Sequence, residues 1–574
     1  MTGTAPHLRF LAAIPAFAAL SPGNLQSLYR ACALKVLAKG EAAVVAGEAV
    51  EELGIVISGR LTGIEPGGGE YGPGSAVTPR AFFTRRPACE TAVALRETVL
   101  LTLAFEDFLD AIRNERELLE EFLARSWRDE SSAEAPPKLS RLVIAPAGSL
   151  RRLDPTLLDT LLSAFESAGE IRLLSRQSFG GGLPGAISLD APETAQWLQE
   201  LELEFDLTVM PVDETDIGFA LEAIEEADSV LFIASGGDPA LSALEEHALR
   251  KRGGGNCRLL IVRGAGSGIA NAGAWAAPRP YRSKQSIDFS SGDARHILAL
   301  GLLGKGCSVA AASRGVYAAA ILGALEALDV TDCPAVSLAA AGSAILPAGL
   351  VACGARPGFI KELFQELANP LFWKRAYRTE TGLCDPAPLD NFLAGALRGF
   401  DIGRAARPFA SLALSFSNGS LVSQSEGRLY EPVRASLAPP GLFPPLVLGN
   451  GDILTSAEGE AAALASTARA LSPAPALQIY AVPRGLGISP LPYKTVAALS
   501  RFKLFKIETP PATPVNLRLE NVLACAGPAP NPAGIPALAL PVDGIGPMDW
   551  GEWDRLRARA YEHVVRELDR KPGA

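Results

Sequence analysis

The sequence is poor in the residues that build metal centres and bind nucleic acid. It has four histidines in 574 residues, no two of them close together, so a histidine-rich metal site is not expected. Its eight cysteines form no C-x-x-C pair, which predicts reduced, buried thiols in a cytosolic protein and neither a disulfide framework nor a zinc site. Lysine and arginine number 53 against 63 aspartates and glutamates, the wrong balance for nucleic-acid binding. We therefore expect no metal, no other cofactor and no nucleic-acid partner.

Long apolar runs are also scarce, although two segments imitate membrane signals. Residues 10–20 resemble a short signal peptide, but Pro15 interrupts the run and a helical pattern restarts soon after it. Residues 333–355 carry no charge and are long enough to span a bilayer, but two prolines and three glycines interrupt them. A strand, a sharp turn and a buried helix explain this second segment better. We predict a soluble, cytoplasmic protein, with peripheral attachment to a membrane left open.

The composition nevertheless supports a large folded protein. Hydrophobic residues make up 48% of the chain and charged residues 20%, which excludes a wholly disordered protein. At about 150 residues per domain, the length indicates three or four domains. Periodicity and turn residues predict an α/β multidomain protein: a β-roll with flanking helices, a polar linker, a doubly wound parallel α/β domain, and a second α/β domain ending in a long helix. These occupy residues 1–128, 129–139, 140–290 and 291–574.

Strands and helices alternate in the domain at 140–290, and one of its turns is rich in glycine. Asp154 followed by Pro155 is typical of a helix start. Residues 264–268 read G-A-G-S-G after an apolar strand, but Ile269 stands where a dinucleotide-binding fingerprint has its third glycine. We interpret this segment as an ordinary strand-to-loop turn.

Three stretches in the last domain form a recognisable pattern. Residues 309–315 read V-A-A-A-S-R-G, residues 321–326 read I-L-G-A-L-E, and residues 433–445 read V-R-A-S-L-A-P-P-G-L-F-P-P. The pattern resembles the patatin-like phospholipase family, in particular the bacterial proteins similar to neuropathy target esterase. The resemblance implies a patatin-like α/β domain, a serine on a G-x-S-x-G elbow, an aspartate in a D-G-[GA] motif and a glycine-rich oxyanion loop. Ser313, Arg314 and Gly315 would be the remnant of that loop.

The departures from this pattern remove the groups that the chemistry needs. Gly342 falls where the family has its serine, and alanines occupy residues 310–312 where the family has loop glycines. The D-G-[GA] position holds S-A-E at residues 456–458, so no aspartate is left there to activate a serine. Losing the nucleophile, the base and the loop glycines together predicts a catalytically degenerate member of the family.

One alternative keeps the chemistry. Ser343 lies one position after the expected serine, and Asp452 lies a few residues before the expected aspartate. A shifted Ser343–Asp452 dyad would make the protein a weak serine esterase or lysophospholipase. Against it, the residue after the apex of an elbow points its side chain away from the mouth, and Asp452 beside Gly451 suits a turn.

The first domain resembles the cyclic-nucleotide-binding fold, which precedes the hydrolase domain in these bacterial relatives. Its residues 39–41 (K-G-E) and 55–60 (I-V-I-S-G-R) match early strands of that fold. The resemblance implies a ligand cassette with a glutamate and, about nine residues later, an arginine for the cyclic phosphate. Pro79 and Ala88 stand at those two positions. Arg85 and Arg86 are the nearby cations that could reach an anion, but we do not expect cyclic-nucleotide binding.

Taken together, the sequence predicts a pseudoenzyme of the patatin-like family that works as a non-catalytic binding, scaffold or regulatory protein. An active paralogous hydrolase or a lipid surface is the partner that we expect, and self-association remains open. Weak hydrolysis by Ser343 is the alternative.

Overall fold

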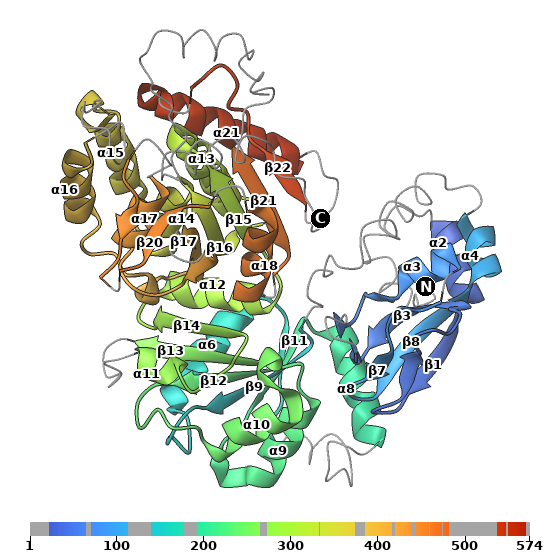
Figure 1. The fold of residues 1–574 in the computed structure, drawn as a ribbon. Helices are drawn as coiled ribbons and strands as arrows, with labels where there is room; N and C mark the ends of the chain where they lie inside the picture. Colours follow the sequence, from blue (N-terminus) through green and yellow to red (C-terminus); the bar gives the residue numbers. More distant parts are fainter. Residues whose placement is uncertain are drawn as a thin grey trace. The chain divides into compact units, whose positions relative to one another are not determined.

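The computed structural model of this chain forms two compact units, one within Met1–Lys305 and one within Gly306–Ser472 and Ala476–Gly573 (Figure 1). Four features predicted from the sequence lie wholly or mostly outside the described residues: the run at 10–20, the linker at 129–139, the turn at 264–268 and Arg86. The described ranges are 22–64, 70–85, 87–112, 139–176, 192–263, 272–331, 333–373, 385–415, 419–437, 443–449, 451–457, 460–472, 474–481, 536–546 and 549–569.

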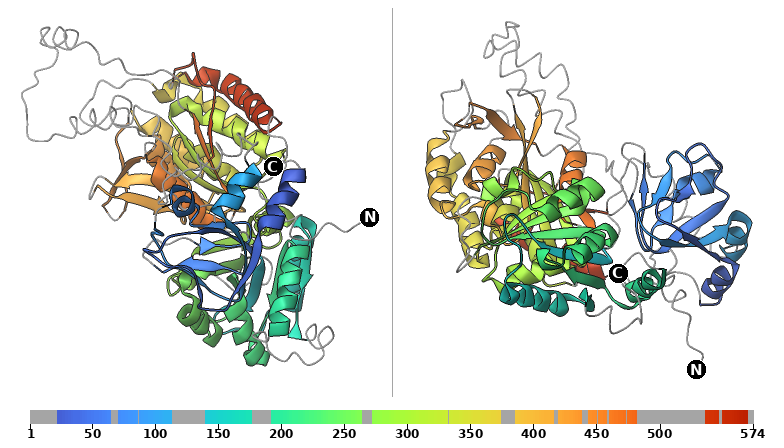
Figure 2. Two further views of the ribbon diagram at one scale, coloured as in Figure 1. Left: turned by 90° about the vertical axis from the view of Figure 1, so that its right-hand side faces the viewer. Right: turned by 90° about the horizontal axis from the view of Figure 1, so that it is seen from below.

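The first unit begins with the predicted β-roll, which consists of two four-stranded antiparallel sheets, with strand orders β1-β8-β3-β6 and β2-β7-β4-β5 (Figure 2). Alternation along β3 builds two cores, because Ile55 and Ile57 pack with Phe108 whereas Val56 packs into a second cluster. The elements are α2 (Pro22–Ala31), β1 (Ala33–Leu37), β2 (Ala42–Val44), β3 (Glu52–Ser58), β4 (Leu61–Gly63), β5 (Glu70–Tyr71), β6 (Ala76–Val77), α3 (Pro79–Thr84), β7 (Ala92–Ala94), β8 (Thr98–Ala104) and α4 (Phe105–Ile112).

The same unit continues with the predicted parallel sheet, in the order β10-β11-β9-β12-β13-β14. Asp154 caps α6 by accepting a hydrogen bond from the Thr156 N–H at 2.8 Å. Ser242 and Glu245 form a capping box at the start of α10. The elements are β9 (Arg141–Pro146), α6 (Pro155–Ala168), β10 (Ile171–Leu173), α8 (Pro192–Glu204), β11 (Leu207–Pro211), α9 (Ile217–Glu226), β12 (Ser229–Ala234), α10 (Ala243–Arg252), β13 (Cys257–Arg263), α11 (Ala272–Ala276), β14 (Ser283–Asp288) and α12 (Gly292–Leu302).

The second unit contains a mixed sheet in the order β19-β20-β17-β16-β15-β21-β22, with β18 paired to β17. Helices cover both faces of its central strands: Val309 and Ala311 of β15 pack into the larger core, and Ala310 and Ala312 pack toward α18. The elements are β15 (Cys307–Ser313), α13 (Ala318–Asp329), β16 (Ala335–Gly342), α14 (Ile345–Ala352), α15 (Pro357–Leu367), α16 (Ala387–Ala396), β17 (Phe409–Ser415), β18 (Leu421–Gln424), α17 (Tyr430–Ser436), β19 (Leu446–Val447), β20 (Ile453–Ser456), α18 (Ala461–Leu471), β21 (Ala476–Ala481), β22 (Ala537–Ala539) and α21 (Trp553–Asp569).

The predicted fold class is confirmed: a β-roll, a parallel α/β sheet and a further α/β sheet follow one another along the chain. We expected the last domain to begin at residue 291. Helix α12 packs on α6, and both lie in the Met1–Lys305 part of the first compact unit. The individual domain limits stay predictions.

The uncharged segment at residues 333–355 forms a strand, a turn and a buried helix, as predicted. It contains β16 and α14, and every residue of β16 is buried. None of the helices in the described ranges combines the length and apolarity that crossing a bilayer requires.

The expectation of buried thiols is correct for Cys257 and Cys307 and wrong for Cys89, which is exposed. Burial raises the pKa of the Cys257 thiol to about 12, which keeps it protonated and unreactive. Cys384 and Cys525 lie outside the described residues.

Candidate functional site

The turn after β16 has the form of a nucleophile elbow, but a glycine occupies its apex. Gly342 ends β16, its φ is +64°, and α14 begins three residues later at Ile345. Ser313, the last residue of β15, lies beside Gly342 in the parallel ladder. A sharp strand-to-helix turn of this kind exposes the apex side chain at the top of the sheet. Here the apex has no side chain to offer as a nucleophile.

Ser343, the next residue, is held inside the protein. Ser343 is 1% exposed, and its hydroxyl lies 2.9 Å from the hydroxyl of Ser313. Its backbone N–H also donates to the Ser313 carbonyl at 2.9 Å. These contacts tie the start of the turn after β16 to the end of β15, so Ser343 acts here as a packing residue.

The position expected for the aspartate is level with the apex but is occupied by serine. Ala341 pairs with Leu412 on β17, and the next residue of β17, Ala413, pairs with Ser456 on β20. Continuing the register by one residue places Gly342 and Ser456 at the same height, two strands apart. At Ser456 the structure therefore has a hydroxyl where the patatin-like pattern has an aspartate, and this hydroxyl is not a general base.

Asp452 directly precedes β20, at the opposite end of this strand from Ser456. It lies four positions before Ser456, which corresponds to about 13 Å of extended chain. Its carboxylate accepts hydrogen bonds from the Ser415 hydroxyl at 2.6 Å and from the Ile453 N–H at 2.9 Å. Ser343 is bonded to Ser313 instead, so the structure does not bring the two residues of the alternative dyad together.

The loop that follows β15 keeps one feature of an oxyanion loop. Gly315 has a φ of +54°, the left-handed region that glycine adopts most readily. Arg314 precedes it with extended backbone and a partly exposed side chain, and the Tyr317 N–H donates to its carbonyl at 3.1 Å. Ala311 and Ala312 are buried in the sheet, so the alanines that replace loop glycines act as core residues.

The longest sequence match has a structural role. Arg434 on α17 is 2% exposed and forms an ion pair with Asp390. Its guanidinium also donates to the Pro444 carbonyl at 3.2 Å and lies 5.7 Å from the centre of the Phe443 ring. Arg434 thus joins α16, α17 and the start of the G-L-F-P-P segment that the structure describes.

In the described part of the roll's ligand cassette, the expected arginine is missing and Arg85 is paired with a carboxylate. Ala88, at the expected arginine position, is 4% exposed. Arg85 has a φ of +51°, pairs with Glu106 at 3.0 Å and lies 4.3 Å from the centre of the Phe105 ring. Pro79 occupies the first turn of α3, where it supplies no N–H donor for a phosphate. The carboxylate beside Arg85 offsets the charge that we considered as a substitute for the lost arginine.

In the first unit, the loops after β9 and β12 contact each other at the place where an open parallel sheet usually binds ligands. Strand order reverses between β9 and β12, so the crevice should lie beyond their carboxyl ends. There the Ser149 N–H donates to the Asp238 carbonyl at 3.1 Å, and the Asp238 N–H donates to the Ser149 hydroxyl at 2.8 Å. A Cβ atom at Gly148 would lie 2.3 Å from the Asp238 carbonyl oxygen and 2.7 Å from the Trp275 ring. The Asp238 backbone and the Trp275 ring therefore occupy the space beside Gly148.

A metal centre finds no support in the part of the chain that the structure describes, where no three His, Cys, Asp or Glu side chains gather as ligands. Sequence reasoning missed a different polar cluster, a set of buried arginines and carboxylates in the first unit, which we analyse below. Its members are far apart in the sequence, and no local spacing marks them.

Two family models match this chain. Residues 34–115 match the cyclic nucleotide-binding domain, and residues 311–458 match the patatin-like phospholipase family. A search of curated proteins found no match.

Solved structures similar to this chain cover about a fifth of it. The N-terminal domain of a transcriptional regulator from Streptomyces coelicolor A3(2) is 26% identical, with 20% of this chain and 86% of that chain covered and a TM-score of 0.18. The sensor domain of the transcriptional regulator DNR from Pseudomonas aeruginosa is 24% identical, with 21% and 85% covered and a TM-score of 0.19. The catabolite activator protein of Thermus thermophilus is 28% identical, with 19% and 55% covered and a TM-score of 0.17.

Proposed function

We propose that this chain, which carries a cyclic nucleotide-binding domain and a patatin-like phospholipase domain, is a pseudoenzyme that serves as a non-catalytic binding, scaffold or regulatory protein. The observation that carries the proposal is Gly342 at the apex of the elbow with a φ of +64°. The backbone keeps the turn that presents a nucleophile, and the side chain that would react is absent.

The losses at this site reinforce one another. In a serine protease, removal of the nucleophile alone lowers turnover by about 10⁶-fold. Ser456 at the aspartate position cannot accept a proton as a carboxylate does, so a serine restored at Gly342 would still lack its base. We expect the remaining scaffold to serve binding and not turnover.

The alternative, weak hydrolysis by Ser343, requires this hydroxyl to reach a substrate. It is buried and bonded to Ser313, and a substrate carbonyl must come within about 3–3.5 Å of an attacking oxygen. These observations favour the pseudoenzyme over the esterase.

The proposal is tested with the full chain, short-chain p-nitrophenyl esters and lysophospholipid. We expect no turnover above that of buffer, and no difference between the natural protein and Ser343→Ala. Turnover that Ser343→Ala abolishes would show a working hydrolase and overturn the proposal. Contaminating esterases are recognised because their activity survives the substitution.

The partner is sought by measuring binding and not catalytic turnover. We expect that an active paralogous hydrolase or a lipid surface binds this chain. Flotation with vesicles of phosphatidylcholine, with and without anionic lipid, tests the lipid surface. Co-purification with a catalytically active patatin-like protein of the same cell tests the paralogue. A scaffold role predicts a stable complex in one of these experiments, and failure of both would contradict it.

A further inference from the structure

Two turns of the β-roll in the first unit are built to project arginines from one end. Gly59 and Arg60 connect β3 to β4, and Arg96 lies in the turn between β7 and β8. The Thr98 hydroxyl accepts a hydrogen bond from the Arg60 N–H at 3.0 Å, which binds the two turns together. Gly59 has a φ of +89°, and a Cβ atom there would lie 2.4 Å from the Thr98 hydroxyl oxygen. The close contact between the turns therefore requires glycine.

The parallel sheet of the same unit presents fixed carboxylates at its amino-terminal edge. Asp228 directly precedes β12, and its Oδ2 accepts hydrogen bonds from the N–H groups of Ser140 at 2.8 Å and Arg141 at 3.0 Å. Glu202 lies near the end of α8, where its Oε1 is 2.6 Å from Arg141 Nε. Both carboxylates are held in place by the α/β domain itself.

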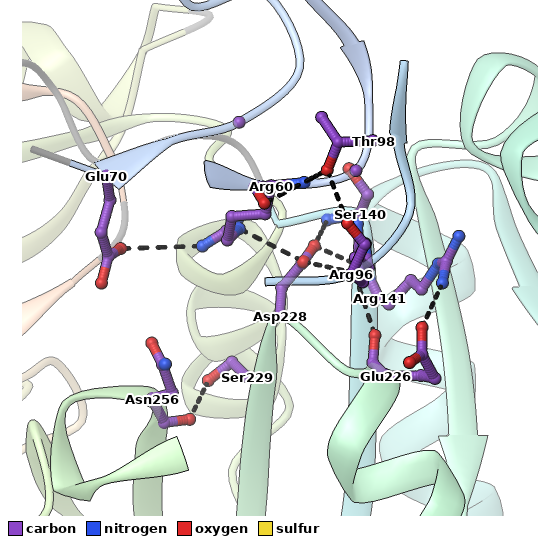
Figure 3. A network of polar contacts seen from close by, with 12 residues as sticks. Arg60, Glu70, Arg96, Thr98, Ser140, Arg141, Glu226, Asp228, Ser229 and Asn256 are labelled. Carbon is purple, nitrogen blue, oxygen red and sulfur yellow. Dashed lines mark hydrogen bonds and ion pairs between the residues drawn. The ribbon is translucent and has the colours of Figure 1, made fainter. Parts of the chain in front are cut away.

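The projected arginines meet these carboxylates (Figure 3). Arg96 Nη1 lies 2.6 Å from Asp228 Oδ1, and Arg60 Nε lies 3.2 Å from the same oxygen. Arg96 also donates from Nη2 to Glu202 Oε1 at 2.9 Å and from Nη1 to the Glu226 carbonyl at 3.0 Å. The Gly59 N–H donates to Glu202 Oε2 at 3.3 Å. The contacts of Asp228 with the arginines are ion pairs by distance, whereas its hydrogen bonds go to the backbone.

The centre of the network is buried, and it extends to two more exposed charges: Arg60 also lies 3.7 Å from Glu70, and Glu226 lies 3.8 Å from Lys39. Three arginines (Arg60, Arg96 and Arg141) face three carboxylates (Glu202, Glu226 and Asp228), and the side chains of Arg96 and Asp228 are 2% and 0% exposed. Burial alone would raise the pKa of Asp228, but the attraction of Arg60 and Arg96 and the Ser140 N–H hold it well below its usual range. Removing any one member leaves a buried charge without its counter-ion, which is far more costly than losing an exposed pair.

Further contacts connect the roll to the α/β domain. Leu203 of α8 packs against the apolar core of the roll, and the Gln199 side chain donates to the Glu97 carboxylate at 2.9 Å. Lys39 of the roll lies 3.6 Å from Glu225 at the end of α9. The roll therefore meets the α/β domain through charged, polar and apolar contacts.

We propose that the six-charge network locks the roll onto the amino-terminal edge of the parallel sheet, so that the roll and the α/β domain move and unfold as one body. The arginines at this end of the roll are committed to the neighbouring domain and are not available to an external anion. The roll then works as a fixed structural part of a two-domain module and not as a hinged sensor. This inference does not depend on whether the second unit is catalytic.

Hydrogen–deuterium exchange of the full chain tests the lock. In the natural protein, peptides from β3 and β8 should share their slowest exchange rate with peptides from β9 and β12, because they open together. Asp228→Asn keeps the shape of the side chain but removes its charge. We expect it to raise exchange in the roll peptides by about 100-fold, while the sheet peptides change much less.

Asp206→Asn is the matched control. Asp206 directly precedes β11 of the same sheet, accepts a hydrogen bond from the Glu170 N–H at 3.1 Å and pairs with Lys305 at 2.7 Å, all within the α/β domain. Because the network stays intact, this substitution should raise exchange only slightly, and by the same factor in the roll and sheet peptides. Roll peptides that exchange faster than sheet peptides in the natural protein would contradict the lock. Equal effects of the two variants on the roll would contradict it as well.

Arg96→Lys keeps the proposal testable should Asp228→Asn fail to fold. Lysine retains the positive charge but cannot contact Asp228 and Glu202 with two separate nitrogens. We expect a smaller, roll-specific rise in exchange of about 10-fold. A rise spread equally over the roll and the sheet would overturn the lock.

Discussion

The elbow of the second unit and the charged network of the first unit differ in whether the functional side chains accompany the backbone geometry. At the elbow the backbone retains a positive φ at Gly342, while the hydroxyl and the carboxylate are absent. In the network the charged groups are present and paired, with two arginines of the roll meeting Asp228. If the elbow is non-catalytic, as we propose, the comparison teaches that packing on both faces of a sheet can hold a turn in place without its chemistry. A buried ionic cluster has no such support and depends on each of its members.

The largest effect should follow from removing one cation of the network. Arg96→Met replaces the guanidinium with an apolar chain and leaves Asp228 and Glu202 with fewer partners. We expect the free energy of unfolding of the first unit to fall by about 3–5 kcal/mol, measured by urea denaturation. Arg85→Met makes the same change at an exposed ion pair with Glu106 and should cost about 1 kcal/mol or less. Equal costs for the two variants would erase the contrast between a buried network and the protein surface.

A smaller effect should follow from disturbing the turn that carries Arg60. Gly59→Ala places a methyl group against Thr98 and strains a backbone at φ +89°. We expect a loss of about 2–3 kcal/mol in the same measurement. Gly40→Ala is the control, because Gly40 has a φ of +83° but nothing within 4 Å of the added atom. Its cost should be that of the conformation alone, about 1 kcal/mol.

At the elbow, the account predicts a small effect on stability. Ser343→Ala removes one hydroxyl pair with Ser313. We expect a loss of about 1 kcal/mol in the stability of the second unit, followed by urea denaturation. A loss of several kcal/mol would mean that this serine is more than a packing residue.

The smallest effect concerns pH. Because the pKa of Asp228 is lowered in the folded protein, its contribution to stability is complete above the unfolded value of about 3.9 and declines only as the pH falls below that value. The urea stability attributed to the network, taken as the difference between the natural protein and Asp228→Asn, should therefore be constant from pH 8 to pH 5. A decline within that range would contradict the lowered pKa.

The sequence predicted the order of the domains better than the polar contacts between residues far apart in the chain. Periodicity and turn residues predicted a β-roll followed by two α/β domains, and the prolines and glycines of residues 333–355 indicated the strand, turn and helix found there. Strand β14 was not predicted because its residues, S-K-Q-S-I-D, are mostly polar and it lies at the edge of the sheet. Motif alignment located the empty apex at Gly342, because the flanking pattern survives the loss of the serine.

The charged network could not be predicted in the same way. Arg96 and the Glu226 carbonyl that it binds are 130 residues apart, and neither residue belongs to a spaced motif. Whether an arginine is buried among carboxylates depends on the packing of the roll against the sheet, which no periodicity of the sequence encodes. The polar pair Ser343–Asp452 shows the opposite case, in which two suitable residues lie near the expected positions and the fold keeps them apart.

The absence of a nucleophile at the elbow is tested most directly by labelling the full-length protein with a fluorophosphonate probe and locating the adduct by mass spectrometry. The account predicts no adduct on Ser343, Ser313 or Ser456, at probe concentrations that label an active serine hydrolase completely. A stoichiometric adduct on Ser343 that disappears in Ser343→Ala would contradict the account and identify a working enzyme.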